Sequence, residues 1–77
     1  MLSAYVLIQT EVGKVAHVAQ ALSGLDGVQE AEDITGPYDI IAKIQAPSPD
    51  QLGRLVASCI QAVDGVTRTL TCTVLHR

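Results

Sequence analysis

The chain contains an internal repeat. Residues 18–28, VAQALSGLDGV, align without gaps on residues 56–66, VASCIQAVDGV, at a shift of 38 positions. In both copies an amphipathic run of helical period is followed by Asp-Gly-Val, a turn sequence that leads into a strand. The chain has only 77 residues, so two such units account for nearly all of it. The repeat predicts two similar halves, each made of a strand, a helix, a turn and a return strand.

Four segments have the composition and alternation of strands. Residues 4–10, AYVLIQT, are rich in β-branched and aromatic side chains. Residues 28–33 and 39–45 flank a Gly-Pro turn and are typical of the two arms of a hairpin. Residues 66–77 alternate threonines with apolar side chains, which predicts a last strand with one hydroxyl-bearing face and one apolar face.

Two amphipathic helices are predicted between these strands. Ser48 is a good N-cap, Pro49 suits the first helical position and Gln51 completes a capping box, so the start of the second helix is well specified. Apolar residues recur at helical spacing in both segments. They are Val15, Val18, Ala19 and Leu22 in the first helix and Leu52, Leu55, Val56, Cys59, Ile60 and Val63 in the second.

This order predicts one α+β domain over residues 1–77, a ferredoxin-like βαββαβ sandwich with a four-stranded antiparallel sheet and both helices on one face. The other face of the sheet would be uncovered. We expect Ile41, Leu75, one side of residues 5–8 and the threonines of the last strand to occupy that face. A partly apolar open face on so small a protein favours dimerisation through the sheets.

Composition excludes several classes of function. The formal charge is −3, and the cationic residues are scattered, so we expect no nucleic-acid contact. No segment is suited to secretion or to crossing a bilayer, and we expect a cytoplasmic protein without membrane contact. Cys59 and Cys72 are too far apart for a CxxC motif, and we expect buried, reduced thiols. The cationic residues are Lys14, Lys43, Arg54, Arg68 and Arg77.

No constellation of residues suggests catalysis, a metal or a cofactor. His17 and His76 lack partners at ligand spacing, and we expect both to be solvated. Glu30, Glu32 and Asp33 fit a solvated edge strand better than a cation site. Phosphate-binding glycine motifs are absent from the sequence. We therefore expect no catalytic residue, no metal site, no cofactor and no enzymatic activity.

Two features are compatible with ligand binding, and each also has a purely structural interpretation. The segment Gly36-Pro37-Tyr38-Asp39 is either a plain hairpin turn or a turn whose backbone and carboxylate meet a ligand. The threonines at positions 67, 69, 71 and 73 either serve as good strand formers or present fixed hydroxyls to a polar ligand. The sequence leaves both alternatives open.

The segments TGPYDIIAKI and DGVTRTLTCTVL resemble the C-terminal effector-binding (RAM) domain of the Lrp/AsnC regulators of bacteria and archaea. The resemblance implies dimers that assemble into octameric or decameric rings, with an amino acid bound between dimers. It also implies effector contacts, with Asp39 as the partner of an α-ammonium group and threonine hydroxyls nearby. The implied effector-binding residues are Gly36, Pro37, Tyr38, Asp39, Thr69 and Thr71.

Members of that family usually carry an N-terminal helix-turn-helix domain, whereas this sequence starts at the first strand of the effector domain. We therefore expect a stand-alone amino-acid-binding and oligomerisation module for transcription regulation, with no DNA-binding domain of its own. It would act on the assembly of a full-length Lrp/AsnC regulator. The alternatives are a purely structural oligomerisation domain without a ligand, or a small dimeric α+β-barrel enzyme built around Tyr5.

Overall fold

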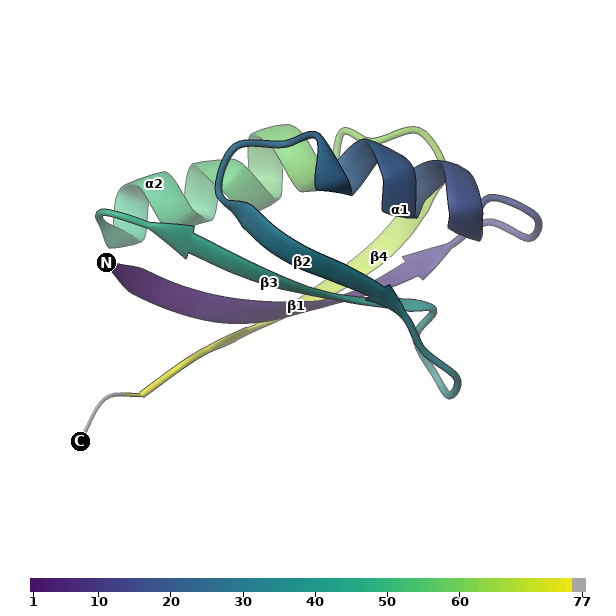
Figure 1. The fold of residues 1–77 in the computed structure, drawn as a ribbon, viewed down its shortest axis with the longest axis horizontal. Helices are drawn as coiled ribbons and strands as arrows, with labels where there is room; N and C mark the ends of the chain where they lie inside the picture. The colour runs from purple at the N-terminus through teal and green to yellow at the C-terminus, as the bar shows by residue number, and fades with distance from the viewer. Residues whose placement is uncertain (76–77) are drawn as a thin grey trace.

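The fold is a single antiparallel sheet covered on one face by helices (Figure 1). A computed structural model describes residues 1–75. The sheet order is β2-β3-β1-β4. This confirms the predicted ferredoxin-like βαββαβ fold. In chain order the elements are β1 (Leu2–Thr10), α1 (Val15–Ser23), β2 (Val28–Asp33), β3 (Ile40–Ala46), α2 (Pro49–Arg54), η1 (Leu55–Ile60) and β4 (Val66–Thr73).

The observed strand ends differ slightly from the predicted ones. β1 begins two residues earlier than expected, at Leu2, and β3 is shifted by one residue to Ile40–Ala46. β4 ends at Thr73 rather than continuing to the end of the chain. His76, for which a solvated position was predicted, lies outside the described residues.

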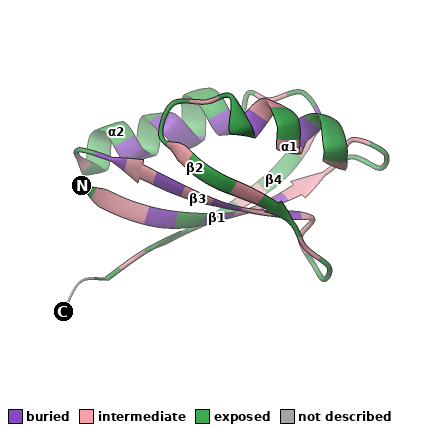
Figure 2. Ribbon diagram, viewed as in Figure 1, coloured by how far each residue is buried: buried purple, intermediate pink, exposed green. Residues whose placement is uncertain are grey.

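The core lies between the sheet and the helices (Figure 2). Alternate residues of the two central strands are fully buried, as the period of two along a strand requires. Burying each large aliphatic side chain stabilises the fold by about 1.5–3 kcal/mol. The fully buried residues are Ala4, Val6 and Ile8 of β1, Ile40, Ala42 and Ile44 of β3, and Val18, Leu22 and Ile60 of the helical layer.

The two repeated Asp-Gly-Val turns have the same backbone conformation. Gly27 and Gly65 have φ angles of 93° and 99°, in the region that favours glycine. Both glycine carbonyls accept a backbone hydrogen bond of 2.8 Å, from Gln45 and Glu11 respectively. The repeat therefore reflects one turn used twice to bring a helix back onto the sheet.

The second helix begins as predicted but changes its winding. The Ser48 hydroxyl accepts a hydrogen bond from the Gln51 N–H at 3.2 Å, and Pro49 is at the first helical position. From Leu55 the helix is of the π type, with a bond from the Gln61 N–H to the Val56 carbonyl at 2.9 Å. The wider turns of a π-helix move Cys59 off the core face. Cys59 is exposed, so its predicted burial is wrong.

The uncovered face of the sheet has a different composition from the one predicted. Thr69, Thr71 and Thr73 pair with Ile8, Val6 and Ala4, so these threonines lie on the helix side. Leu70 and Cys72 pair with Leu7 and Tyr5 and therefore lie on the open side, where Ile41 also lies, as predicted. These three threonines were predicted on the open face and Cys72 was predicted to be buried, and both predictions are wrong.

The position of β4 explains this reversal. β4 is an edge strand, while α1 packs over β2 and β3 and α2 packs over β3. The helix-side positions of β4 therefore lie beside the helical layer rather than beneath it, and hydroxyl-bearing side chains can remain partly solvated there. Leu70 and Cys72 of β4 are left on the face that the helices do not cover.

We predict that Gly27→Ala lowers the free energy of unfolding by about 2 kcal/mol or more, from backbone strain and overpacking. A Cβ there would lie 2.8 Å from Leu55 Cδ2 and 3.0 Å from the Gln45 carbonyl oxygen. Gly53→Ala is the matched control, because nothing lies within 4 Å of its added Cβ. The free energy of unfolding of Gly53→Ala should rise by about 0.5–1 kcal/mol, because alanine has the higher helix propensity. Urea denaturation at equal protein concentration measures both, and equal effects would contradict the prediction.

Candidate functional site

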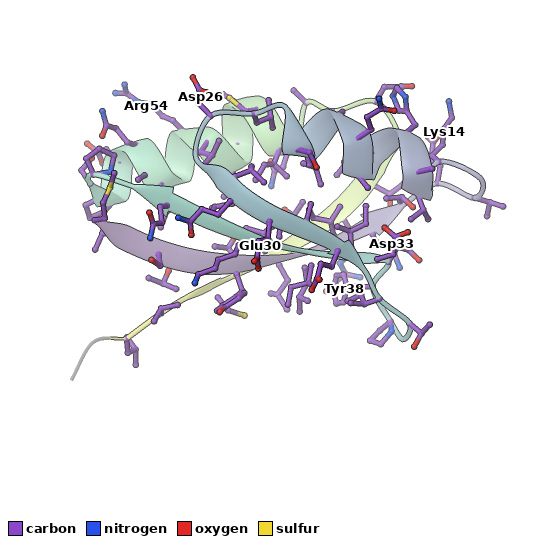
Figure 3. All side chains as sticks on the ribbon, viewed as in Figure 1. Lys14, Asp26, Glu30, Asp33, Tyr38 and Arg54 are labelled. Atoms are coloured by element: carbon purple, nitrogen blue, oxygen red, sulfur yellow. The ribbon has the colours of Figure 1, made fainter. Side chains whose placement is uncertain are left out.

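The β2–β3 loop projects from the sheet on the side opposite the helices (Figure 1). A hydrogen bond of 2.9 Å from the Ile34 N–H to the Asp39 carbonyl closes the loop around residues 35–38. Gly36 has a φ of 131°, which confirms that glycine supplies an unusual dihedral angle to this turn. Tyr38 is half-buried and lies where the loop returns to the sheet (Figure 3).

The end of β1 holds the loop in place. The Asp39 carboxylate accepts two hydrogen bonds at Oδ2, from the Thr10 N–H at 2.8 Å and from the Thr10 hydroxyl at 3.3 Å. The Asp39 N–H donates to the Ile8 carbonyl at 2.9 Å. The Gln9 side-chain amide donates to the Pro37 carbonyl at 3.4 Å. Thr10 was not among the predicted site residues, and nothing in its local sequence distinguishes it.

The two threonines predicted to contact an effector lie elsewhere, on the helix side of β4. The Thr69 hydroxyl accepts a hydrogen bond of 2.8 Å from the Gln61 side-chain amide, another residue that the sequence analysis missed. Thr71 lines a groove of about 490 Å³ between β4 and α2, and the groove is mostly apolar. Its lining residues are Leu2, Pro49, Leu52, Gly53, Val56, Thr71 and Thr73.

Within one chain, the predicted site residues therefore form two separate groups. Residues 36–39 lie together at the end of the sheet, next to β1. Thr69 and Thr71 lie across β1 from that loop, on the face that carries the helices. One chain does not bring both groups into one pocket, and the effector-binding role of all six residues stays a prediction.

No charged residue is buried in the part of the chain that the structure describes. Glu30 (Figure 3) and Glu32 are exposed on β2, an edge strand, as predicted. His17 is exposed, as predicted, and its Nε2 lies 4.0 Å from Asp64 Oδ2. The same oxygen is 3.5 Å from the Lys14 ammonium group. These pairs link the start of α1 to the second Asp-Gly-Val turn.

Among residues 1–75, no three His, Cys, Asp or Glu side chains are grouped so that they could hold a metal ion. None of the helices in the same range has the length and apolarity needed to cross a membrane.

Together, the fold and the anchored loop define a small α+β sandwich domain with a fixed turn at one end of its sheet. A family described as the Lrp/AsnC ligand binding domain matches residues 3–77. The chain belongs to this family.

Similar proteins occur in several settings. A homocitrate synthase of Sulfurisphaera tokodaii is 42% identical over 60 residues, which make up 78% of this chain but only 13% of that enzyme. TTHA0845 from Thermus thermophilus is 31% identical, with a TM-score of 0.94 over 100% of this chain and 96% of its own. E. coli AsnC is 28% identical, with a TM-score of 0.91 over 99% of this chain and 52% of its own.

We predict that Gly36→Ala lowers the free energy of unfolding by about 1–3 kcal/mol, because an L-residue is strained at a positive φ. Nothing lies within 4 Å of the added Cβ. The loss should therefore be smaller than that of Gly27→Ala, where strain and a close contact coincide. Urea denaturation measures the difference, and full stability of Gly36→Ala would show that the turn does not maintain this conformation.

Proposed function

We propose that this domain binds an amino acid and that binding changes how its copies assemble. The observation that supports a ligand is the family match, which covers residues 3–77 and describes a ligand-binding domain. The proposal includes no catalytic step. An amino acid is the ligand class because it carries both an anionic and a cationic group, which the polar loop and the threonine hydroxyls can accommodate.

Similar segments occur in proteins of different kinds, which supports a sensor domain that can be joined to different functional domains. One similar segment makes up 13% of a homocitrate synthase, and another makes up 52% of AsnC. A domain that occurs both in an enzyme and in a protein of the AsnC type is better suited to sensing a small molecule than to taking part in the activity of either protein. We propose the same role here, with co-assembly with a full-length Lrp/AsnC regulator carrying the response to transcription.

The open face of the sheet supports self-association. Tyr5 and Leu70 are 40% and 47% exposed there, beside the half-buried Leu7 and Ile41. The edge strand β4 places Leu70 and Cys72 on this face and the hydroxyls of its last three threonines on the helix side, the reverse of what burial within one chain would favour. A second copy packed on this face would bury those residues, and such a sheet-to-sheet dimer is the simplest closed assembly.

Assembly gives the ligand a way to act. A ligand shifts an equilibrium only when its affinity differs between the two states. In our proposal the anchored loop of one dimer and the threonine strand of a neighbour form the complete site, so the ligand binds the assembled ring of eight or ten copies more tightly than free dimers. This also accounts for the separation of the two groups within one chain.

A purely structural role remains the second candidate, and one observation favours it. The Asp39 carboxylate and the Thr69 hydroxyl are both engaged inside the chain, by Thr10 and Gln61. A domain whose predicted ligand groups serve its own fold would need no effector in order to assemble.

Isothermal titration of the twenty amino acids separates the two candidates. We predict that at least one binds with a Kd between about 1 μM and 1 mM, equivalent to roughly −8 to −4 kcal/mol. Absence of heat for all twenty up to millimolar concentrations would favour the structural role.

We predict that Leu70→Glu converts the dimer to a monomer, because dimerisation would bury an unpaired carboxylate on an apolar face. The fold should be retained, since Leu70 lies outside the core. Val12→Glu is the matched control, because Val12 is fully exposed in the loop between β1 and α1, away from the sheet. Analytical ultracentrifugation measures both variants. A dimer that survives Leu70→Glu would show that this face is not the interface.

A further inference from the structure

We infer that the Asp39 carboxylate is a positioning group that fixes the β2–β3 loop to the end of β1, and that it does not neutralise the ammonium group of an effector. The part of this inference that concerns ligand recognition rests on the proposed function. The part that concerns the loop rests on the hydrogen bonds of the chain alone.

The first argument is the use of the carboxylate itself. Asp39 Oδ2 accepts from the Thr10 N–H at 2.8 Å and from the Thr10 hydroxyl at 3.3 Å, and both bonds are partly buried. Hydrogen bonds to an ionised carboxylate are shorter and stronger than bonds between neutral groups. An ammonium group bound to this oxygen would compete with both hydrogen bonds. It would therefore weaken the attachment of the loop to β1.

The second argument is that the backbone of Asp39 is engaged as well. Its N–H donates to the Ile8 carbonyl and its carbonyl accepts from the Ile34 N–H, both at 2.9 Å. Asp39 therefore joins the two ends of the β2–β3 loop to each other and to the end of β1. A residue with this many internal bonds is suited to holding a loop and poorly suited to reorienting toward a ligand.

A second contact supports the loop from the same strand. The Gln9 side chain donates to the Pro37 carbonyl at 3.4 Å, while the Gln9 carbonyl accepts from the Thr67 hydroxyl at 3.1 Å. The end of β1 is thus tied to the loop on one side and to β4 on the other. A ligand at this loop would meet backbone groups of residues 35–38 in a geometry that β1 has already fixed, which lowers the entropic cost of binding.

Asparagine at position 39 separates positioning from charge. The side-chain carbonyl of Asn accepts from the Thr10 N–H and hydroxyl as the carboxylate does, but it carries no charge. Asp39→Asn should therefore keep the loop attached, whereas Asp39→Ala should release it. Asp33→Ala is the matched control, because it removes an exposed carboxylate from the same hairpin, and none of the hydrogen bonds that hold the loop involves its side chain.

Amide hydrogen exchange tests the loop without any ligand. Exchange at the Thr10 and Ile34 amides should quicken at least about tenfold in Asp39→Ala and stay within about threefold of the wild type in Asp39→Asn and Asp33→Ala. Unchanged exchange in Asp39→Ala would overturn the positioning role.

Titration with each amino acid that binds the wild type tests recognition. A positioning role predicts that Asp39→Asn keeps the affinity within about threefold and that Asp39→Ala loses about tenfold or more. Equal losses in both variants, with normal exchange in Asp39→Asn, would show an ion pair with the ligand and overturn the inference. If no amino acid binds the wild type, the proposed function fails while the exchange result still decides whether Asp39 holds the loop.

Discussion

Strand β1 is the element on which the rest of the structure depends, because it is paired along most of its length on both sides, with β3 and with β4. One set of its alternating residues, Ala4, Val6 and Ile8, is fully buried under the helices. The other set, which includes Tyr5 and Leu7, lies on the uncovered face. The end of β1 then holds the β2–β3 loop through Thr10 and Asp39. Core, open face and loop therefore share one strand.

This arrangement would connect the proposed assembly with the candidate site. Packing of a second copy on the open face would restrain Tyr5 and Leu7, in the same strand whose last residues anchor the loop. In a ring, the loop of one dimer would face the threonine strand of another, so that neither group is complete alone. If the domain assembles as we propose, the separation of the two groups within one chain would follow from assembly, and the internal hydrogen bonds of Asp39 and Thr69 would hold each group in place beforehand.

Much of the fold could be predicted from the sequence, because its signals are local. The repeated Asp-Gly-Val turns and the alternation of Ile40, Ala42 and Ile44 depend on neighbouring residues, and the structure confirms them. Alternation shows that β4 has a threonine face and an apolar face. Which of the two lies toward the helices depends on where the helices pack on the sheet, and alternation alone does not show that. The π-type winding that exposes Cys59 likewise depends on tertiary packing.

The candidate site was less predictable for a related reason. The turn could be located from its Gly-Pro sequence, but the bond that fixes it joins Asp39 to a residue 29 positions away, in another strand. Thr10 and Gln61 have no local feature that marks them as partners of Asp39 and Thr69. Hydrogen bonds between distant segments follow from the register of the sheet, and that register is set by the whole core.

We propose that the domain assembles through its open sheet face and that an amino acid changes the assembly. Light scattering coupled to size exclusion, with and without a mixture of amino acids in the buffer, tests both parts together. We predict a mass of at least a dimer in the absence of the mixture and a shift to a larger assembly in its presence. A monomer under both conditions would contradict it.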